Sequence, residues 1–141
     1  MEERKNYIGV KLIQAEPKER DGKEGYAVFC PQEDGTWYES WSPKWVFEKA
    51  YFPIADASKI SQSDIESFIS QSDIKVEKRN EKSTLVDVVM PTGFTDYEVS
   101  SCVVPANYDE ELGKRYALAN IKGRLWSKLG FMFQWAKCGL K

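Results

Sequence analysis

The chain has 141 residues, of which 42% are hydrophobic and 30% charged, and its formal net charge is −2. This length and composition are typical of a globular chain with a core of its own and exclude a disordered one. A chain without a basic excess is not expected to have nucleic acid as its main partner. It has no histidine, the commonest general base and metal ligand, and three cysteines without CxxC spacing. We therefore expect a non-enzymatic binding protein with no metal, no cofactor and no disulfide framework.

The chain also lacks the patterns of membrane and secreted proteins. Its first ten residues are charged and contain no apolar run of signal-peptide length. No segment approaches the ~20 apolar residues of a membrane span. We expect a protein of the reducing cytoplasm.

The N-terminal part predicts three strands and a short helix. Asp21-Gly22 is a turn signal within a polar loop, and a hairpin turn is expected at residues 32–35. Ser42 is a suitable N-cap, and Pro43 then stands at the first helical position of a helix that ends before Pro53. The expected strands are residues 7–14, 25–30 and 36–41.

The pentapeptide SQSDI occurs twice, at residues 61–65 and 70–74. Ser63 and Glu66 have the spacing of a capping box, which predicts one short spacer helix here. Two copies of five residues do not indicate a solenoid.

The C-terminal part predicts three more strands and the longest helix. The helix begins at Tyr108 and runs at least to Leu129, with Asn107 as N-cap and Glu110 completing a capping box. The predicted fold class is α+β: an antiparallel sheet, the long helix packed across it, and short helices at its edges. One domain, 1–141, is expected, with modules at residues 1–55, 56–73 and 74–141. The strands are expected at residues 74–79, 84–90 and 94–104.

Two stretches carry a resemblance. The first, similar to a leader module of many phage proteins, reads YIG at 7–9, QAEP at 14–17, EGY at 24–26, SWSP at 40–43, VFE at 46–48 and AY at 50–51. The second reads GF at 93–94, then SCVVPANYDEELG at 101–113, then Ala117, Asn120 and WSKLG at 126–130. It resembles the family of phage proteins named for the gene 49 and gene 66 products of two tailed phages, although Ala119 and Leu129 stand where an acidic residue is usual. The resemblance implies a small phage accessory protein and implies no activity.

Three tryptophans, Trp37, Trp41 and Trp45, lie close together in the sequence. Trp37 and Trp41 are four apart and share a face of a strand, and Trp45 falls in the first turn of the following helix. Either they belong to the core, where large aromatics dominate the energetics, or they form a platform on which a base stacks.

The last helix combines a wide apolar arc with two cations, Arg115 and Lys122, which the periodicity places within that arc. A cation at such a position needs an anionic partner or access of its charged group to water. Its long stem can reach water, it can pair with an acid elsewhere in the fold, or both cations can bind an anion such as a phosphate. The width of the arc also predicts packing on a second surface, and therefore a homo-oligomer.

These features give two hypotheses of function. In the first, the protein is a counter-defence protein of the host cytoplasm that sequesters a small anionic ligand, for example a cyclic nucleotide signal. In the second, it is a protein–protein antagonist that inhibits a host defence enzyme. The expected ligand-binding residues of the first hypothesis are Arg115, Lys122, Trp41, Trp45, Asn107 and Tyr97.

Overall fold

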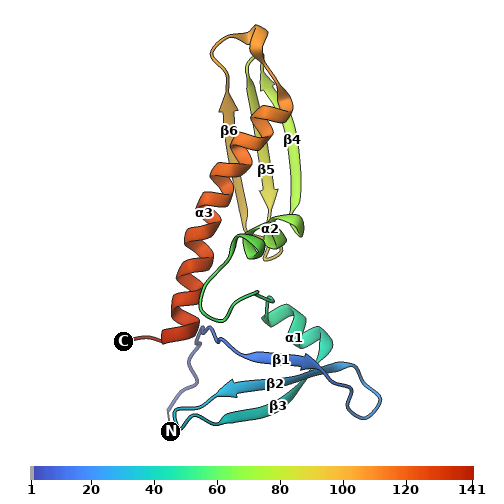
Figure 1. Ribbon diagram of the computed structural model, residues 1–141, viewed down its shortest axis with the longest axis vertical. Helices are drawn as coiled ribbons and strands as arrows, with labels where there is room; N and C mark the ends of the chain where they lie inside the picture. Colours follow the sequence, from blue (N-terminus) through green and yellow to red (C-terminus); the bar gives the residue numbers. More distant parts are fainter. Residues whose placement is uncertain (1) are drawn as a thin grey trace. The chain divides into compact units, whose positions relative to one another are not determined.

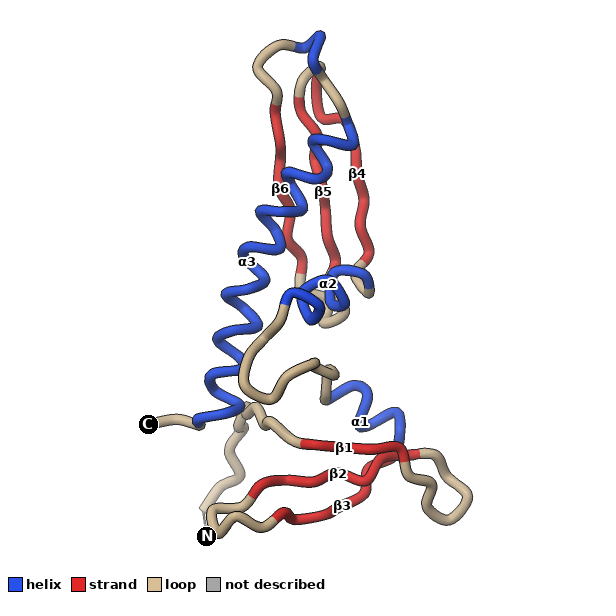
Figure 2. Tube along the Cα trace, in the orientation of Figure 1, coloured by secondary structure: helices blue, strands red, loops and turns tan. Residues whose placement is uncertain are grey.

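The computed structural model describes residues 2–141 and divides into two compact units. The first unit comprises residues 2–57 together with Met132–Lys141, and the second is Ser58–Phe131. Each unit contains its own three-stranded antiparallel sheet (Figure 2). With three α-helices beside these sheets, the predicted α+β class is confirmed.

The sheet of the first unit has the order β1-β2-β3. Asp21 and Gly22 form the predicted turn between β1 and β2, with φ angles of 52° and 77°. Gly35, with a φ of 85°, closes the predicted turn between β2 and β3, and its amide donates to the Gln32 carbonyl at 3.1 Å. The strands are β1 Gln14–Pro17, β2 Gly25–Pro31 and β3 Trp37–Pro43.

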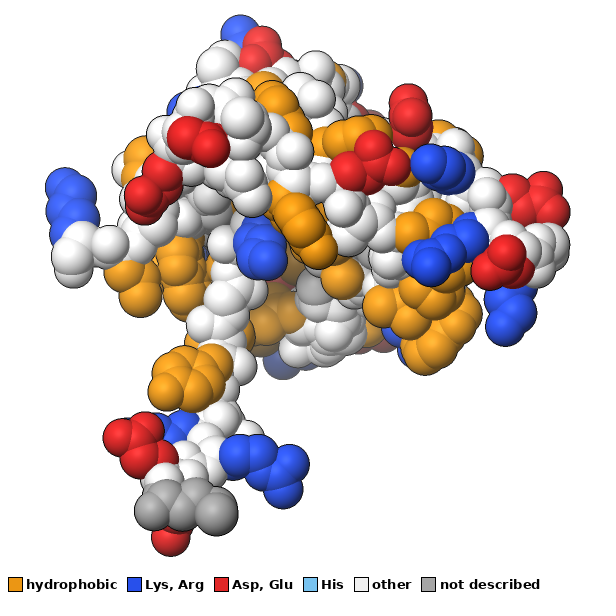
Figure 3. Space-filling view, turned by 90° about the horizontal axis from the view of Figure 1, so that it is seen from below, with side chains coloured by type: hydrophobic (Ala, Val, Ile, Leu, Met, Phe, Trp, Pro, Cys, Tyr) orange, Lys and Arg blue, Asp and Glu red, His pale blue; other side chains and the backbone are white. Residues whose placement is uncertain are grey.

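The strand predicted at residues 7–14 is wrong except for its last residue. The side chains of Tyr7 and Ile8 are 89% and 85% exposed, and these residues belong to no strand. In Figure 3 the N-terminal segment is a narrow run of atoms in which a hydrophobic side chain stands among charged ones. An apolar segment forms a strand only where a neighbouring strand completes its backbone hydrogen bonds. Here β2 pairs with Gln14–Pro17 and not with the apolar residues before them.

Helix α1, Lys44–Ala50, begins one residue later than predicted. Pro43 still belongs to β3 and is the N-cap, so Ser42 does not cap the helix. Aromatic contacts hold α1 on the sheet instead. The Phe47 ring stacks on Tyr26 with centroids 4.1 Å apart, and the Tyr26 hydroxyl donates to Glu48 at 2.7 Å.

The second unit carries the predicted meander of three strands with the order β4-β5-β6. Helix α2, Gln62–Ser70, precedes it, and helix α3, Glu110–Cys138, follows after the 3-10 turn Pro105–Asn107. Within this unit α3 crosses one face of the sheet (Figure 1), and it continues unbroken through Gly130. The strands are β4 Asp73–Asn80, β5 Ser83–Val89 and β6 Thr95–Ser101.

Both predicted caps in this part of the chain are wrong. The capping box of α2 joins Ser61 and Asp64, two residues before the predicted pair, because SQSDI offers a serine at each position. At α3 the cap is Asp109, whose Oδ1 accepts from the Leu112 amide at 3.1 Å. Asn107 lies in the 3-10 turn, since Tyr108 has an extended backbone and separates that turn from the helix.

The core of the second unit lies between the sheet and the helices. Val86 and Val88 of β5 are fully buried, and α2 adds Ile65, Phe68 and Ile69. Helix α3 contributes four buried residues at a spacing of four, which is one stripe of a helix surface. They are Ala117, Ile121, Leu125 and Leu129.

Candidate binding surfaces

The strongest electrostatic cluster of the second unit is centred on Arg124 of α3. Its guanidinium donates to both oxygens of Asp96, at 2.9 and 3.1 Å, and to Glu98 at 2.9 Å. One further N–H donates to the main-chain carbonyl of Tyr97 at 3.0 Å. The two carboxylates are accessible to this one side chain because alternate residues of β6 point to the same face.

The charges in this cluster shift one another's pKa. The hydrogen bond from Arg124 lowers the pKa of Glu98 below its usual value. Burial works against ionisation of Asp96, but hydrogen bonds from Arg124 and the Tyr97 amide outweigh it and lower the pKa of that carboxyl as well. Both acids in turn raise the pKa of Arg124. All three groups therefore stay charged at neutral pH, and the cluster ties α3 to the edge of the sheet.

Sequence reasoning missed Arg124, although a signal was present. Asp96 and Glu98 alternate on a strand whose inward face meets a helix, and an inward carboxylate requires a cation nearby. The next helix offers several lysines and arginines, so the sequence does not identify which of them provides the charge.

Lys122 pairs with an acid elsewhere in the fold, which is one of the alternatives that the sequence left open. Its ammonium lies 3.0 and 3.1 Å from the two oxygens of Glu66 on α2. This hydrogen bond lowers the pKa of Glu66. Arg115 is exposed, and its side chain makes no salt bridge or hydrogen bond within residues 2–141. The two predicted anion ligands therefore differ, since one is already paired and the other faces solvent.

The apolar arc predicted on α3 divides into a buried and an exposed part. Two aromatic residues of that arc, Tyr116 and Trp126, are 57% and 37% exposed. We call the exposed part the outer face of α3. Its members recur at alternating spacings of four and three along the helix. They are the half-buried Leu112 and the exposed Tyr116, Ala119, Gly123 and Trp126.

The glycines of α3 also behave differently from one another. A side chain at Gly113 would overlap the Thr84 hydroxyl, so close packing explains this glycine. At Gly123 and Gly130, added Cβ atoms would have no neighbour within 4 Å, so packing within the described chain does not explain these two glycines. Gly123 leaves a shallow gap on the outer face.

The remaining predicted residues of this unit lie apart from those on α3. Tyr97 is 66% exposed and alternates with Asp96 and Glu98, so it faces away from α3 on the other side of the sheet. Asn107 is exposed in the 3-10 turn. The structure thus does not join Tyr97 with Arg115 and Lys122 in one pocket.

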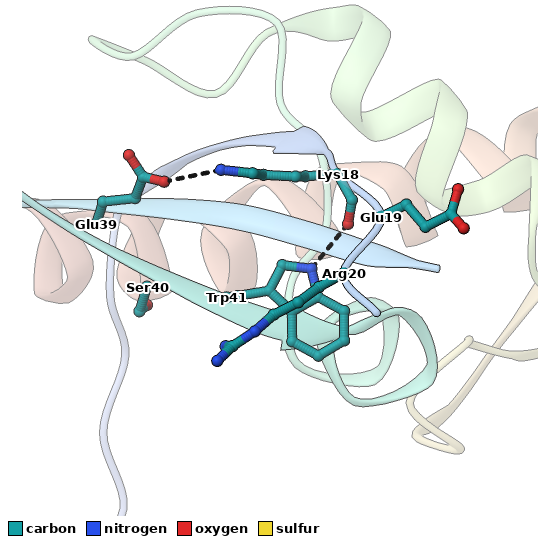
Figure 4. A pocket seen from close by; sticks show the side chains of 6 residues that line it. All are labelled: Lys18, Glu19, Arg20, Glu39, Ser40 and Trp41. Atoms are coloured by element: carbon teal, nitrogen blue, oxygen red, sulfur yellow. Dashed lines mark hydrogen bonds and ion pairs between the residues drawn. The ribbon is translucent and has the colours of Figure 1, made fainter. Parts of the chain in front are cut away.

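Trp41 of the first unit lies in a shallow pocket (Figure 4). The indole N–H donates to the Lys18 carbonyl at 2.7 Å, and the Arg20 guanidinium lies 5.7 Å from the ring centroid. Gly25 lies under the ring, where any side chain would overlap it. The pocket has two cations and two acids, and Lys18 is 3.3 Å from Glu39. It is lined by Lys18, Glu19, Arg20, Glu39, Ser40 and Trp41.

The three tryptophans do not form one cluster. Trp37 shares the sheet face of Trp41, as predicted, and is 48% exposed. Trp45 on α1 is 69% exposed. Trp41 is therefore partly packed, and Trp45 is a surface residue.

The described chain shows neither a metal-binding group nor a membrane helix. Within residues 2–141, no three His, Cys, Asp or Glu side chains are close enough together to hold a metal ion. In the same range, no helix combines the length and the apolar character needed to cross a membrane.

Comparison with known proteins identifies a family. No curated protein and no solved structure matches the chain. One family model matches residues 60–136, which include nearly all of the second unit and more than half of the chain's 141 residues. This match confirms the family resemblance of residues 93–130. The chain belongs to the phage protein family described as "Phage protein (N4 Gp49/phage Sf6 gene 66) family".

Proposed function

We propose that this phage protein is a non-enzymatic counter-defence protein that acts in the host cytoplasm by binding and covering a host protein. The observation that carries the proposal is the outer face of α3. It presents Tyr116 and Trp126 to solvent on either side of Ala119 and Gly123. Tyrosine, tryptophan and arginine dominate the binding energy of protein interfaces.

The shape of this face favours a protein over a small molecule. Small ligands bind in concave sites that enclose most of their surface, whereas the outer face follows the convex side of a helix. Small residues flanked by aromatic ones allow another helix to approach closely and then make contact on both sides. Arg115 stands beside this strip without a salt bridge in the described chain. The partner we propose is an amphipathic helix with an acidic flank.

Truncating one interface tryptophan tests the proposal. A photo-crosslinking residue at position 119 identifies the partner in host cells, and its affinity is then measured with purified proteins. Trp126→Ala is expected to weaken binding by about 2 kcal/mol or more, roughly 30-fold. Arg115→Ala is expected to have a smaller effect that decreases with added salt.

Trp45→Ala is the matched control, because Trp45 is also an exposed helical tryptophan but belongs to the first unit. The control should bind like the wild type. Loss of binding in Trp45→Ala with full affinity in Trp126→Ala would reject the outer face as the contact.

A second candidate is sequestration of a nucleotide-type anion in the host cytoplasm. The observation in its favour is Arg20 above the indole of Trp41, with Lys18 beside it. A guanidinium can stack on a base, and the two cations can neutralise a phosphate. Glu19 and Glu39 line the same pocket, and their charge opposes an anion. For this reason we rank this candidate second.

A thermal-shift panel of mononucleotides and cyclic dinucleotides separates the two candidates. A shift that disappears in Arg20→Ala supports an anion site at Trp41. A shift that disappears in Arg115→Ala instead supports the site predicted from sequence. No shift with any nucleotide eliminates sequestration of that class and leaves the protein partner.

A further inference from the structure

The two edges of the second sheet differ in how they are protected. Strand β4 pairs with β5 alone, and no other strand within residues 2–141 lies along its outer edge (Figure 1). On the opposite edge, the Arg124 guanidinium donates a hydrogen bond to the main-chain carbonyl of Tyr97 in β6. It also binds the carboxylates of Asp96 and Glu98. An uncovered edge strand is a template for pairing with another chain. The accessible template of this sheet is β4.

Strand β4 carries charges of alternating sign on the side facing away from α3. Asp73, Lys75 and Glu77 are exposed, and they alternate with the half-buried Ile74 and Val76. None of the three has an ion-pair partner among the residues that the structure describes. Arg79 extends the pattern to −, +, −, +. Such a row is self-complementary, because its reverse order has the opposite sign at every position.

This symmetry selects one register for a second copy. In an antiparallel pair about a two-fold axis at Val76, Lys75 lies opposite Glu77 of the other copy, and Asp73 opposite its Arg79. Opposite charges directly across two strands stabilise a pair, and like charges destabilise it. Residues directly opposite each other in an antiparallel pair have their side chains on the same face of the sheet. The two-fold axis therefore passes through a residue position, and the alternative registers have it at Lys75 or at Glu77.

The neighbouring registers bring like charges together. With the axis at Lys75, this lysine faces its own copy and Asp73 faces Glu77. With the axis at Glu77, this glutamate faces its own copy and Lys75 faces Arg79. Charges on an edge strand ordinarily prevent pairing. Here they oppose both neighbouring registers and favour the one about Val76.

We propose that a second copy of this chain binds along β4, antiparallel and centred on Val76, so that two three-stranded sheets join into one of six strands. On the face towards α3, Val76 meets its own copy and Ile74 meets the stem of Lys78. The Lys78 ammonium lies over the Tyr108 ring, 4.7 Å from its centroid, so only the aliphatic stem of Lys78 is left for this contact. The irregularity between Lys78 and Asn80 ends the regular pairing at Lys78, so Asp73 and Arg79 meet at the two ends of the paired segment.

Charge reversal on β4 tests this proposal with the purified full-length chain. Wild-type protein is expected to sediment with twice its mass of 16.2 kDa and to dissociate more readily as salt is added. Lys75→Glu and Glu77→Lys, each alone, are expected to weaken dimerisation at least ~10-fold through like-charge contacts. The double variant Lys75→Glu/Glu77→Lys exchanges the two signs, so that opposite charges again lie across the pair, and it is expected to dimerise like the wild type.

Mixing the two single variants provides a stricter test. Each fails to pair with itself, but together they bring every Glu opposite a Lys, so a one-to-one heterodimer should form. Lys82→Glu, the same charge change in the turn after β4, is the matched control and should leave the dimer intact. All variants change exposed side chains, so at concentrations where every protein is monomeric their melting temperatures should equal that of the wild type.

Three results would each overturn the proposal. They are a wild-type protein that stays monomeric up to about 1 mM, a dimer unaffected by both single reversals, and single variants that fail to combine on mixing. The experiment needs no host protein. The dimer along β4 is therefore tested separately from the binding of a host protein to the outer face of α3.

Discussion

The two units contain similar elements but hold them together differently. Of the twelve apolar residues buried within residues 2–141, only Ala27 and Val28 belong to the first unit. That unit relies on the stacked rings of Tyr26, Phe47 and Tyr51 and on polar contacts around Trp41. The second unit has a continuous stripe of α3 buried on its sheet.

The family match follows this difference. It begins at residue 60, two residues into the second unit, and leaves out the first sheet entirely. The part that is characteristic of the family is thus the part with the extensive core. A three-stranded sheet needs a partner to cover its apolar face, and α3 provides much more cover than the seven-residue α1.

The largest effect is expected from truncation in the buried stripe. Ile121→Ala removes a fully buried side chain and should lower the free energy of unfolding by ~2–5 kcal/mol, because the cavity cannot refill. Residue-resolved hydrogen exchange should show the greatest loss of protection in β5 and α3, and a smaller one in β2.

The matched change on the solvent side of the same helix is Tyr116→Ala. Since Tyr116 is 57% exposed, its effect on stability should stay within ~0.5 kcal/mol. Equal loss of protection in both units after Ile121→Ala would contradict the description of two cores.

A smaller effect is expected from Arg124→Ala. It leaves Asp96 and Glu98 without their cation, and because the arginine side chain is 41% exposed, the loss should be about 1–2 kcal/mol. Both acids have a lowered pKa in the folded state. Their contribution is therefore complete above their ordinary pKa values of 3.8 and 4.5, and it is lost as the pH falls through the lowered values.

Denaturant titrations between pH 7 and pH 3 measure this contribution. Wild-type stability should decline more steeply below about pH 4.5 than that of Arg124→Ala. Arg115→Ala, an arginine truncation on the same helix, should retain the wild-type profile. Parallel pH profiles for wild type and Arg124→Ala would show that the cluster does not stabilise the fold.

The smallest effect has the opposite sign. Gly123→Ala should stabilise the protein by ~0.5–1 kcal/mol, because alanine favours the helix and its Cβ meets no atom within 4 Å. Gly113→Ala should destabilise it, since its Cβ would overlap Thr84. Thermal melts of the two variants suffice. A destabilised Gly123→Ala would mean that the outer face is already covered in solution.

Periodic patterns predicted most elements, whereas local signals failed where context decides. The strands β4 and β5 and the core role of Ile65, Phe68 and Ile69 follow from apolar alternation and helical spacing. The repeated SQSDI shows the limit. At residues 61–65 it caps and opens α2, but at 70–74 it ends α2 and begins β4. The same five residues take different structures because different partners surround them.

The binding surfaces could be predicted less well. The sequence identified Lys122 as a cation needing a partner but could not indicate Glu66, which lies 56 positions away. It placed Arg115 inside an apolar arc because helical spacing groups residues without showing which side a sheet will cover. The buried stripe consists of Ala117, Ile121, Leu125 and Leu129, and Arg115 lies outside it and faces solvent.

The hydrogen bond from Arg124 to the Tyr97 carbonyl has a consequence for particle size. A sheet that offers both edges to further chains can continue to grow, as happens in fibrils. A sheet with one edge covered uses its only free edge when the first partner pairs with it, and no further chain can then be added. Arg124 would thus set an upper bound on stoichiometry from a position on a helix, and its removal would turn a closed pair into an open-ended ribbon.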